Sequence, residues 1–238
     1  MRRLALALAA ILAWSSTTLA QSSIGPILLQ QRQTGSGGIS VQDIANYTTS
    51  GTIPDYQPNN WYLPINLAAT GAGTNPSAGS IRLYPEFIPI ALTINNLGVR
   101  VTTLSAGGNI QAAIYKNNPT TGRPTGTPLV STASMSTASV ASVSATAALS
   151  LQPGLYWFAT NCDNATATFG SFGSTSMMAG WMVGSASQSS DFSGATGLMG
   201  LTVSQTFGTW PDLTAGSFTE VGSINSIPIV QFEVASVP

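Results

Sequence analysis

The stretch "LGVRVTTLSAGGNIQAAIYK" (residues 97–116) decides the fold class, because apolar and polar residues alternate in it with a period of two. The apolar members are Leu97, Val99, Val101, Ile110, Ala112 and Ile114. Alternation of this kind, rich in β-branched residues, predicts strands that bury one face. The glycine pair at 107–108 interrupts the pattern, so we expect an antiparallel hairpin that turns within 105–109.

Further strands are expected on both sides of this stretch, because short apolar runs are separated by segments rich in Gly, Pro, Ser and Asn. The expected strands cover 59–68, 154–161, 176–184, 197–207 and 226–235, and the expected loops cover 33–38, 69–80 and 117–128. Residues 131–150 alternate weakly between small side chains and form either two strands or a low-complexity ribbon.

The chain is therefore predicted to be all-β, since no stretch keeps the 3.6-residue period of a long amphipathic helix. We expect an antiparallel jelly-roll-like β-sandwich over residues 55–238, preceded by an extended N-terminal arm over 21–54.

The segment "GLYWFATN" (154–161) is apolar on both faces, as expected of a strand that is buried on both sides or carries a functional face. Trp157 shares one face with Leu155 and Ala159, which favours a place in the core. Tyr156 lies on the opposite face, where it reaches either the surface or a subunit interface.

The composition narrows the classes of function. Only 6% of the 238 residues are Asp, Glu, Lys or Arg, against about a quarter in an average domain. The few basic residues are scattered, so no cationic face for nucleic acid is expected. The chain has no histidine and a single cysteine, Cys162, so it lacks the commonest general base and cannot form an internal disulfide.

Residues 1–20 resemble a targeting segment. Arg2 and Arg3 precede an apolar run that ends in Thr18-Leu19-Ala20, which is the layout of a secretory signal peptide with cleavage after Ala20. The alternative is an apolar segment that is retained and docks on another protein. In either case the run is too short to be a permanent membrane span.

The sequence shows no recognisable set of catalytic side chains. Asp163, Asp191 and Asp212 are carboxylates in the loop-rich half of the chain and are expected to be surface loop residues rather than a glycosidase pair. Lys116 is the sole lysine that could activate a serine, and no Ser-Lys motif accompanies it. In "NCDNAT" (161–166) a calcium site is weighed against a turn built on Asn and Asp side chains, and the turn is favoured. We expect no enzyme, no metal site and no cofactor.

Aromatic side chains are the feature of the sequence that points to a binding function. Pyranose rings stack their apolar C–H faces on Trp and Tyr, while neighbouring amides and hydroxyls supply hydrogen bonds. The chain is rich in Asn, Gln, Ser and Thr, so glycan binding fits its surface. The candidate ligand-binding residues are Trp61, Tyr62, Tyr156, Trp181 and Trp210.

The order of several short motifs resembles a jelly-roll domain that recurs at the C-terminal ends of bacteriophage and prophage tail proteins. The resemblance covers residues 59–238. Its motifs are Trp61-Tyr62, Tyr84 to Phe87, Gly98 to Thr103, Ala106 to Gly108, Ile114-Tyr115 and Leu151 to Trp157.

This resemblance implies a non-enzymatic protein of the virion surface, structural or receptor-binding, that contacts host-surface glycans. It also implies a homo-oligomer, with a trimer as one form, in contact with other virion proteins. The signal-peptide-like segment keeps an alternative open, a secreted bacterial carbohydrate-binding or surface-attachment protein released by cleavage near Ala20. Neither alternative involves nucleic acid.

Overall fold

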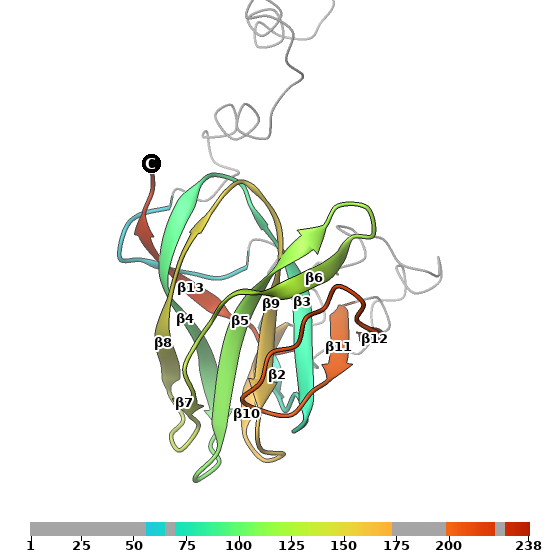
Figure 1. Ribbon diagram of the computed structural model, residues 1–238. Coiled ribbons are helices and arrows are strands. Elements are labelled where there is room, and N and C mark those ends of the chain that lie inside the picture. Colours follow the sequence, from blue (N-terminus) through green and yellow to red (C-terminus); the bar gives the residue numbers. More distant parts are fainter. Residues whose placement is uncertain (1–55, 65–69, 173–198, 222–226) are drawn as a thin grey trace, which may run out of the picture. The chain divides into compact units, whose positions relative to one another are not determined.

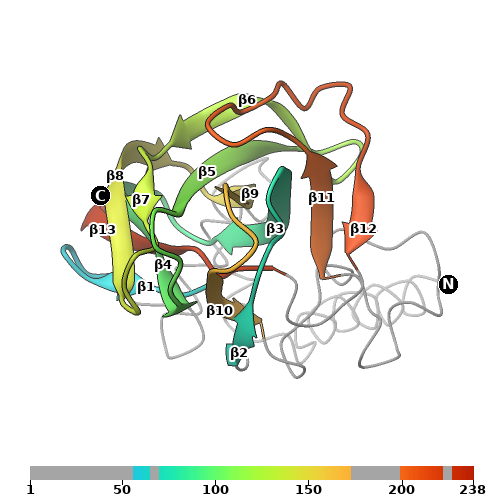
Figure 2. The same cartoon turned by 90° about the horizontal axis from the view of Figure 1, so that it is seen from below.

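The computed structural model describes residues 56–64, 70–172, 199–221 and 227–238. These residues form two antiparallel sheets packed face to face (Figure 1, Figure 2). The segment 1–20, the arm 21–54 and the strand expected at 176–184 lie outside them. Within the described ranges the chain forms strands, turns and loops, and no helix there is long and apolar enough to cross a membrane.

The six-stranded sheet runs in the order β1-β13-β4-β10-β2, with β8 on the other side of β4. Its strands are β1 (Trp61–Tyr62), β2 (Thr70–Thr74), β4 (Leu92–Thr103), β8 (Ser142–Leu151), β10 (Thr168–Phe172) and β13 (Gln231–Ser236). The seven-stranded sheet runs β12-β11-β3-β9-β5-β6, with β7 also on β5. Its strands are β3 (Ser80–Ile88), β5 (Asn109–Asn118), β6 (Arg123–Ser131), β7 (Met135–Ser136), β9 (Gly154–Cys162), β11 (Gly200–Ser204) and β12 (Thr219–Val221).

The pairing of these strands is nested. β5 pairs with β6, and the strands that flank this hairpin in sequence, β4 and β8, pair in the other sheet. The next pair outward, β3 with β9, returns to the first sheet, and β2 with β10 closes the series. Eight strands that wrap as nested pairs across two sheets are a jelly roll. The predicted all-β, antiparallel jelly-roll sandwich is confirmed.

The hairpin expected over residues 97–116 is wrong, because β4 and β5 lie in different sheets. The turn between them crosses from one sheet to the other. Thr137 holds it in place by accepting from the Ser105 N–H at 2.9 Å and donating its own N–H to Gly108 at 2.9 Å. Alternation indicates only that each strand buries one face. Two strands of a hairpin and two strands in facing sheets both meet this condition, so the pattern does not distinguish them.

Two expected loops contain strands. In the proline-rich stretch 117–128, β5 continues to Asn118 and β6 starts at Arg123. Pro124 lies opposite Asn117, in an edge strand, where a missing N–H is tolerated. β2 lies within the glycine-rich stretch 69–80, also at an edge. Composition indicated loops here because edge strands tolerate the same residues.

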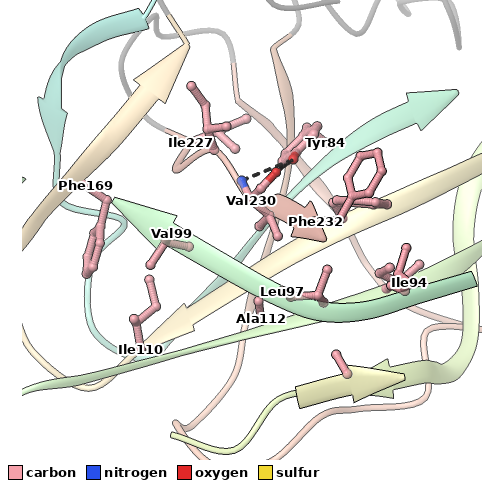
Figure 3. Packing of buried hydrophobic residues seen from close by; sticks show 14 of the residues in the cluster. Tyr84, Ile94, Leu97, Val99, Ile110, Ala112, Phe169, Ile227, Val230 and Phe232 are labelled. Carbon is pink, nitrogen blue, oxygen red and sulfur yellow. Dashed lines mark hydrogen bonds between the residues drawn. The ribbon is translucent and has the colours of Figure 1, made fainter. Parts of the chain in front are cut away.

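The main core lies between the sheets and is built from the inward-facing residues of both (Figure 3). Its largest side chains include Tyr84, Phe158, Phe169 and Phe232. Tyr84 is the polar member, and its hydroxyl donates to the Val230 C=O at 3.0 Å and accepts from the Val230 N–H at 3.2 Å. A fully buried hydroxyl is stable there because both of its hydrogen bonds are made.

A second core lies on the outer face of the seven-stranded sheet. Residues 205–218, which we call the strap, cross this face between β11 and β12. The strap is tied to the sheet at Pro211, whose C=O accepts from the Tyr115 hydroxyl, and at Leu213, whose N–H donates to Gly126. Beneath it Trp157 is completely buried and donates its indole N–H to Asn117 at 3.0 Å. Thus β9 is buried on both faces, as expected for Trp157.

Candidate functional site

The outer face of the six-stranded sheet carries polar side chains and is called here the polar face. It is formed by the residues of β4, β8 and β13 that point away from the main core, in strands whose side chains alternate except at irregularities such as the register shift between Ile94 and Asn96 of β4. The outward residues are Thr93, Asn96, Arg100, Ser142, Ser144, Thr146, Ser150, Gln231 and Glu233. Hydroxyls and amides dominate this face, with one cation and one carboxylate among them.

Trp61 lies on this face. It stands on β1 opposite Glu233 of β13, and 41% of its surface is exposed. The next residue, Tyr62, faces the core side, as alternation along a strand requires. An exposed indole this large, on a face otherwise rich in hydroxyls, is a feature that core packing does not explain.

Gly98 on β4 makes room for the indole. A Cβ atom at position 98 would lie 3.1 Å from Cζ3 of Trp61 and 2.9 Å from the carbonyl oxygen of Val143. The ring of Trp61 therefore reaches from β1 across β13 to the backbone of β4. The absence of a side chain at Gly98 lets the indole lie close to the sheet rather than stand away from it.

Polar groups flank the ring. The side-chain amide of Asn96 donates to Oε2 of Glu233, directly across the β4–β13 pair. This bond fixes the orientation of the amide and of the carboxylate beside Trp61. Gln231 lies opposite Gly98, and Arg100 is exposed two residues farther along β4.

An arrangement of this kind suits a pyranose ring. One apolar aromatic surface lies beside hydrogen-bonding groups of fixed orientation, which are the two elements that sugar recognition uses. The groups are amide, carboxylate and guanidinium rather than a cluster of one charge, so a surface of this kind would suit an uncharged or weakly charged ligand.

Tyr62 belongs to the layer beneath Trp61. Its ring packs edge-on against Tyr56, with centroids 4.7 Å apart, and stacks on Phe232 at 5.9 Å. Its hydroxyl accepts from the Gln57 N–H at 2.6 Å. Burial raises the pKa of Tyr56 far above its usual range. Tyr62 thus packs in the layer beneath Trp61 and supports the polar face from the core side.

Tyr156 lies elsewhere, at the start of β9, half-buried against the main core. Its hydroxyl donates to the Gln152 C=O at 3.0 Å, four residues back, and burial raises its pKa. This bond closes the turn before β9, so the side chain has a local structural role.

Trp210 lies in the strap, on the opposite outer face of the sandwich from Trp61. Its ring meets Tyr115 edge-on with centroids 6.3 Å apart, and its indole nitrogen is buried. Trp181 lies outside the described residues. Of the five predicted aromatics the structure brings Trp61 and Tyr62 together and separates both from Tyr156 and Trp210.

The two predicted aspartates that the structure describes, Asp163 and Asp212, form turns. Asp163 accepts from the backbone and the side-chain amide of Asn109 at 2.7 and 2.9 Å, and Asn164 accepts from the N–H groups of Thr166 and Ala167. The expected turn at 161–166 is confirmed. Asp212 accepts from the Thr214 N–H in a similar turn. Asp191 lies outside the described residues, within which no three of His, Cys, Asp and Glu gather as metal ligands.

Sequence reasoning missed Asn96, Gly98 and Glu233 as parts of the site. Alternation along 231–236 does place Glu233 on the outward face, so this residue was within reach. Its neighbourhood with Asn96 depends on the pairing of β4 with β13, which are separated by more than a hundred residues. Compared with protein-family models and with curated protein sequences, the chain matches none.

Proposed function

We propose that this protein is a non-enzymatic, glycan-contacting protein of the surface of a bacteriophage or phage-like particle, structural or receptor-binding. The observation that carries the proposal is Trp61, which is exposed, lies close to Gly98 and is flanked by the hydrogen-bonded pair Asn96 and Glu233. Glycan recognition uses this combination of a flat apolar ring and oriented polar groups.

Residue chemistry supports a binding role over catalysis. The chain has no histidine. The carboxylate oxygens of Asp163 and Asp212 accept hydrogen bonds within turns. The pKa values of both groups lie below the usual range, so neither serves as a general acid near neutral pH.

The particle assignment is supported by the motif order over 59–238 and by the jelly-roll topology, a fold that recurs in capsid proteins and in lectins. Fold alone does not carry function, so the sequence resemblance is the stronger support. The same resemblance supports a homo-oligomer that contacts other virion proteins.

A second function is favoured by one feature, the signal-peptide-like layout of residues 1–20. A secreted bacterial carbohydrate-binding or surface-attachment protein would carry such a segment and lose it near Ala20. N-terminal sequencing of the protein from its native source separates the two. The particle proposal predicts a chain that starts at Met1 or Arg2, whereas a start at Gln21 favours secretion.

Glycan contact is tested by equilibrium binding to a panel of neutral hexasaccharides of glucose, galactose and N-acetylglucosamine, together with lipid-free bacterial O-polysaccharide. We expect at least one member to bind and Trp61→Ala to weaken that binding by about tenfold or more, as for an aromatic hot spot. Trp61→Tyr keeps an aromatic ring and should retain most of the affinity.

The matched control is Val140→Ala, which removes an exposed apolar side chain (51% exposed) that is not part of the polar face. Its affinity should equal that of the wild type. If Trp61→Ala and Val140→Ala bind every active glycan equally well, the polar face is not the binding site and the proposal fails.

A further inference from the structure

The further inference concerns β8, the strand at the rim of the six-stranded sheet (Figure 1). β8 pairs with β4 along one side over ten residues, Ser142–Leu151. Among the described strands none pairs with its other side. In Figure 2, β8 lies at the end of its sheet next to β6 of the facing sheet.

Three residues of β8 direct their backbone groups to the open side. The Ala141 C=O accepts from the Val101 N–H at 2.8 Å, which continues the register in which Ser142 faces Arg100. Hydrogen-bonded and non-hydrogen-bonded pairs alternate along an antiparallel ladder. Since Ala141 bonds to β4, the N–H and C=O groups of Ser142, Ser144 and Thr146 point away from it.

This edge lacks the features that usually prevent edge-to-edge pairing. The sequence "SVSATAALSL" (142–151) contains no charge, no proline and no glycine. Over Ser142–Thr146 its pairing with β4 is regular, and the register shift comes only beyond that stretch. By contrast, edge strand β6 carries Pro124 and Pro128, and β12 has three residues with Glu220 among them. Uncharged edges with a regular stretch of this kind are templates for a further strand.

The apolar side chains along the same rim are incompletely covered. Val143, Ala145 and Leu149 of β8 face the main core but are only half-buried, and so are Leu129 and Val130 of β6 on the facing sheet. Among the described residues, therefore, no strand covers the side of the sandwich where β6 and β8 approach each other. A neighbour at this rim would complete the burial of these side chains.

We propose that the open side of β8 pairs with β8 of a second copy of this chain, antiparallel and centred on Ser144. Around such a twofold axis Ser144 faces its own counterpart and Ser142 faces Thr146 of the second copy. The outward N–H and C=O groups of these residues then bond across the interface, and their hydroxyls meet as cross-strand pairs.

A second copy is the favoured occupant because the edge is complementary to itself. An isologous interface brings each residue against its equivalent, so any charge near the axis would meet a like charge. β8 has none, in a chain whose charged residues are few but present on two other edge strands, β6 and β12. The half-buried row of Val143 and Ala145 would likewise pack against Ala145 and Val143 of the second copy.

The dimer would join two polar faces into one continuous surface, with both Trp61 side chains on the same side. This consequence rests on the proposed function, whereas the interface itself does not. Two Trp61 rings on one rigid surface would raise the avidity for a repeating polysaccharide.

The test measures the oligomeric state of the full chain without glycan, by sedimentation equilibrium. We expect a dimer, and we expect Ser144→Lys to weaken it by about tenfold or more, because two lysines would face each other at the axis. Ser150→Lys adds the same charge to the same strand and face, beyond the paired stretch, and should dimerise like the wild type.

A second variant separates pairing from folding. Ser144→Pro removes an N–H that points away from β4, so the variant should remain folded as a monomer with a cooperative melting transition, while the dimer is lost. A wild type that stays monomeric at high concentration would overturn the proposal, as would a dimer or trimer that both Ser144 variants leave intact. Because no glycan is present, neither outcome depends on the proposed function.

Discussion

At the scale of single residues, the site depends on one small residue beneath one large one. Trp61 can lie close to the sheet because Gly98, two strands away, has no side chain. Such a pair is invisible to a reading of local sequence, since the two residues are 37 positions apart and one of them is a glycine inside an alternating strand. Both residues are therefore informative positions for substitution.

Gly98→Ala should disturb both stability and binding. The added Cβ would lie 2.9 Å from the Val143 carbonyl oxygen and 3.1 Å from the indole of Trp61. Because the backbone oxygen cannot move aside freely, we expect the free energy of unfolding to fall by about 1–3 kcal/mol, as in overpacked sites. Denaturant titration measures this loss, and a glycan affinity equal to that of the wild type would show that the position of the indole does not matter.

Tyr84→Phe should lower the free energy of unfolding by more than the loss of a single hydrogen bond would. The hydroxyl bonds to both the C=O and the N–H of Val230, which is completely buried. Its removal leaves two buried backbone groups without this partner, so we expect the free energy of unfolding to fall by about 1–3 kcal/mol.

Tyr156→Phe is the matched control for that change. It also deletes a tyrosine hydroxyl that bonds to a carbonyl, but this hydroxyl is near solvent, where water can replace it. Its loss should lower the free energy of unfolding by less than about 1 kcal/mol. Equal losses in the two variants would contradict the role given to Tyr84.

At the scale of elements, the strap 205–218 determines what the outer face of the seven-stranded sheet does. It covers Trp157 and Tyr115 with Leu213 and Trp210, so this face is a second core rather than a binding surface. The aromatic run of β9 is explained by this cover. The sequence indicated a strand apolar on both faces, but not which segment covers the outer one, because the strap lacks any period.

Leu213→Ala tests the strap. This side chain is 2% exposed, so its truncation should lower the free energy of unfolding by about 2–4 kcal/mol through lost burial and a residual cavity. Leu63→Ala makes the same change at a side chain that is 46% exposed, and should stay within about 0.5 kcal/mol of the wild type. If both variants unfold at the same denaturant concentration, the strap contributes no core.

Elements were easier to predict than their partners. The strands around 97–116 and 154–161 follow from period two, which depends only on which residues face the core. The hairpin expected between the first two failed, because the turn at 105–108 passes between sheets and local sequence does not encode that choice. Pro124 led to a different error, because its stretch was predicted to be a loop but belongs to a strand. An edge strand accepts a proline that a central strand would not.

At the scale of the whole molecule, charged residues are few, at 6% of the chain, and some of the described ones stabilise the fold. One that does is Asp163, whose carboxylate joins β9 to the start of β5 through Asn109. Partial burial opposes its ionisation, but hydrogen bonds from Asn109 and Asn164 outweigh this and lower its pKa below the ordinary 3.8. The carboxylate therefore stabilises the fold above that value, and this contribution is lost as the pH falls through the lower folded-state pKa.

Asp163→Asn should remove this pH dependence. We expect the variant to melt at a lower temperature than the wild type near pH 7, and the two melting temperatures to converge as the pH falls below the lowered folded-state pKa of Asp163, where the wild-type carboxyl is protonated. Calorimetry across this range measures the difference, and Asp212 is unchanged in both proteins. A gap that stays constant with pH would show that the Asp163 charge does not stabilise the fold.

The most direct measurement of the proposed function follows the tryptophan indole N–H signals by NMR while the tightest-binding glycan of the panel is added. The chain has five tryptophans, so each signal can be assigned by substitution. We predict that the Trp61 signal shifts in a saturable manner while those of Trp157 and Trp210 stay in place. A glycan that binds and moves another indole, leaving that of Trp61 unchanged, would contradict a binding site on the polar face.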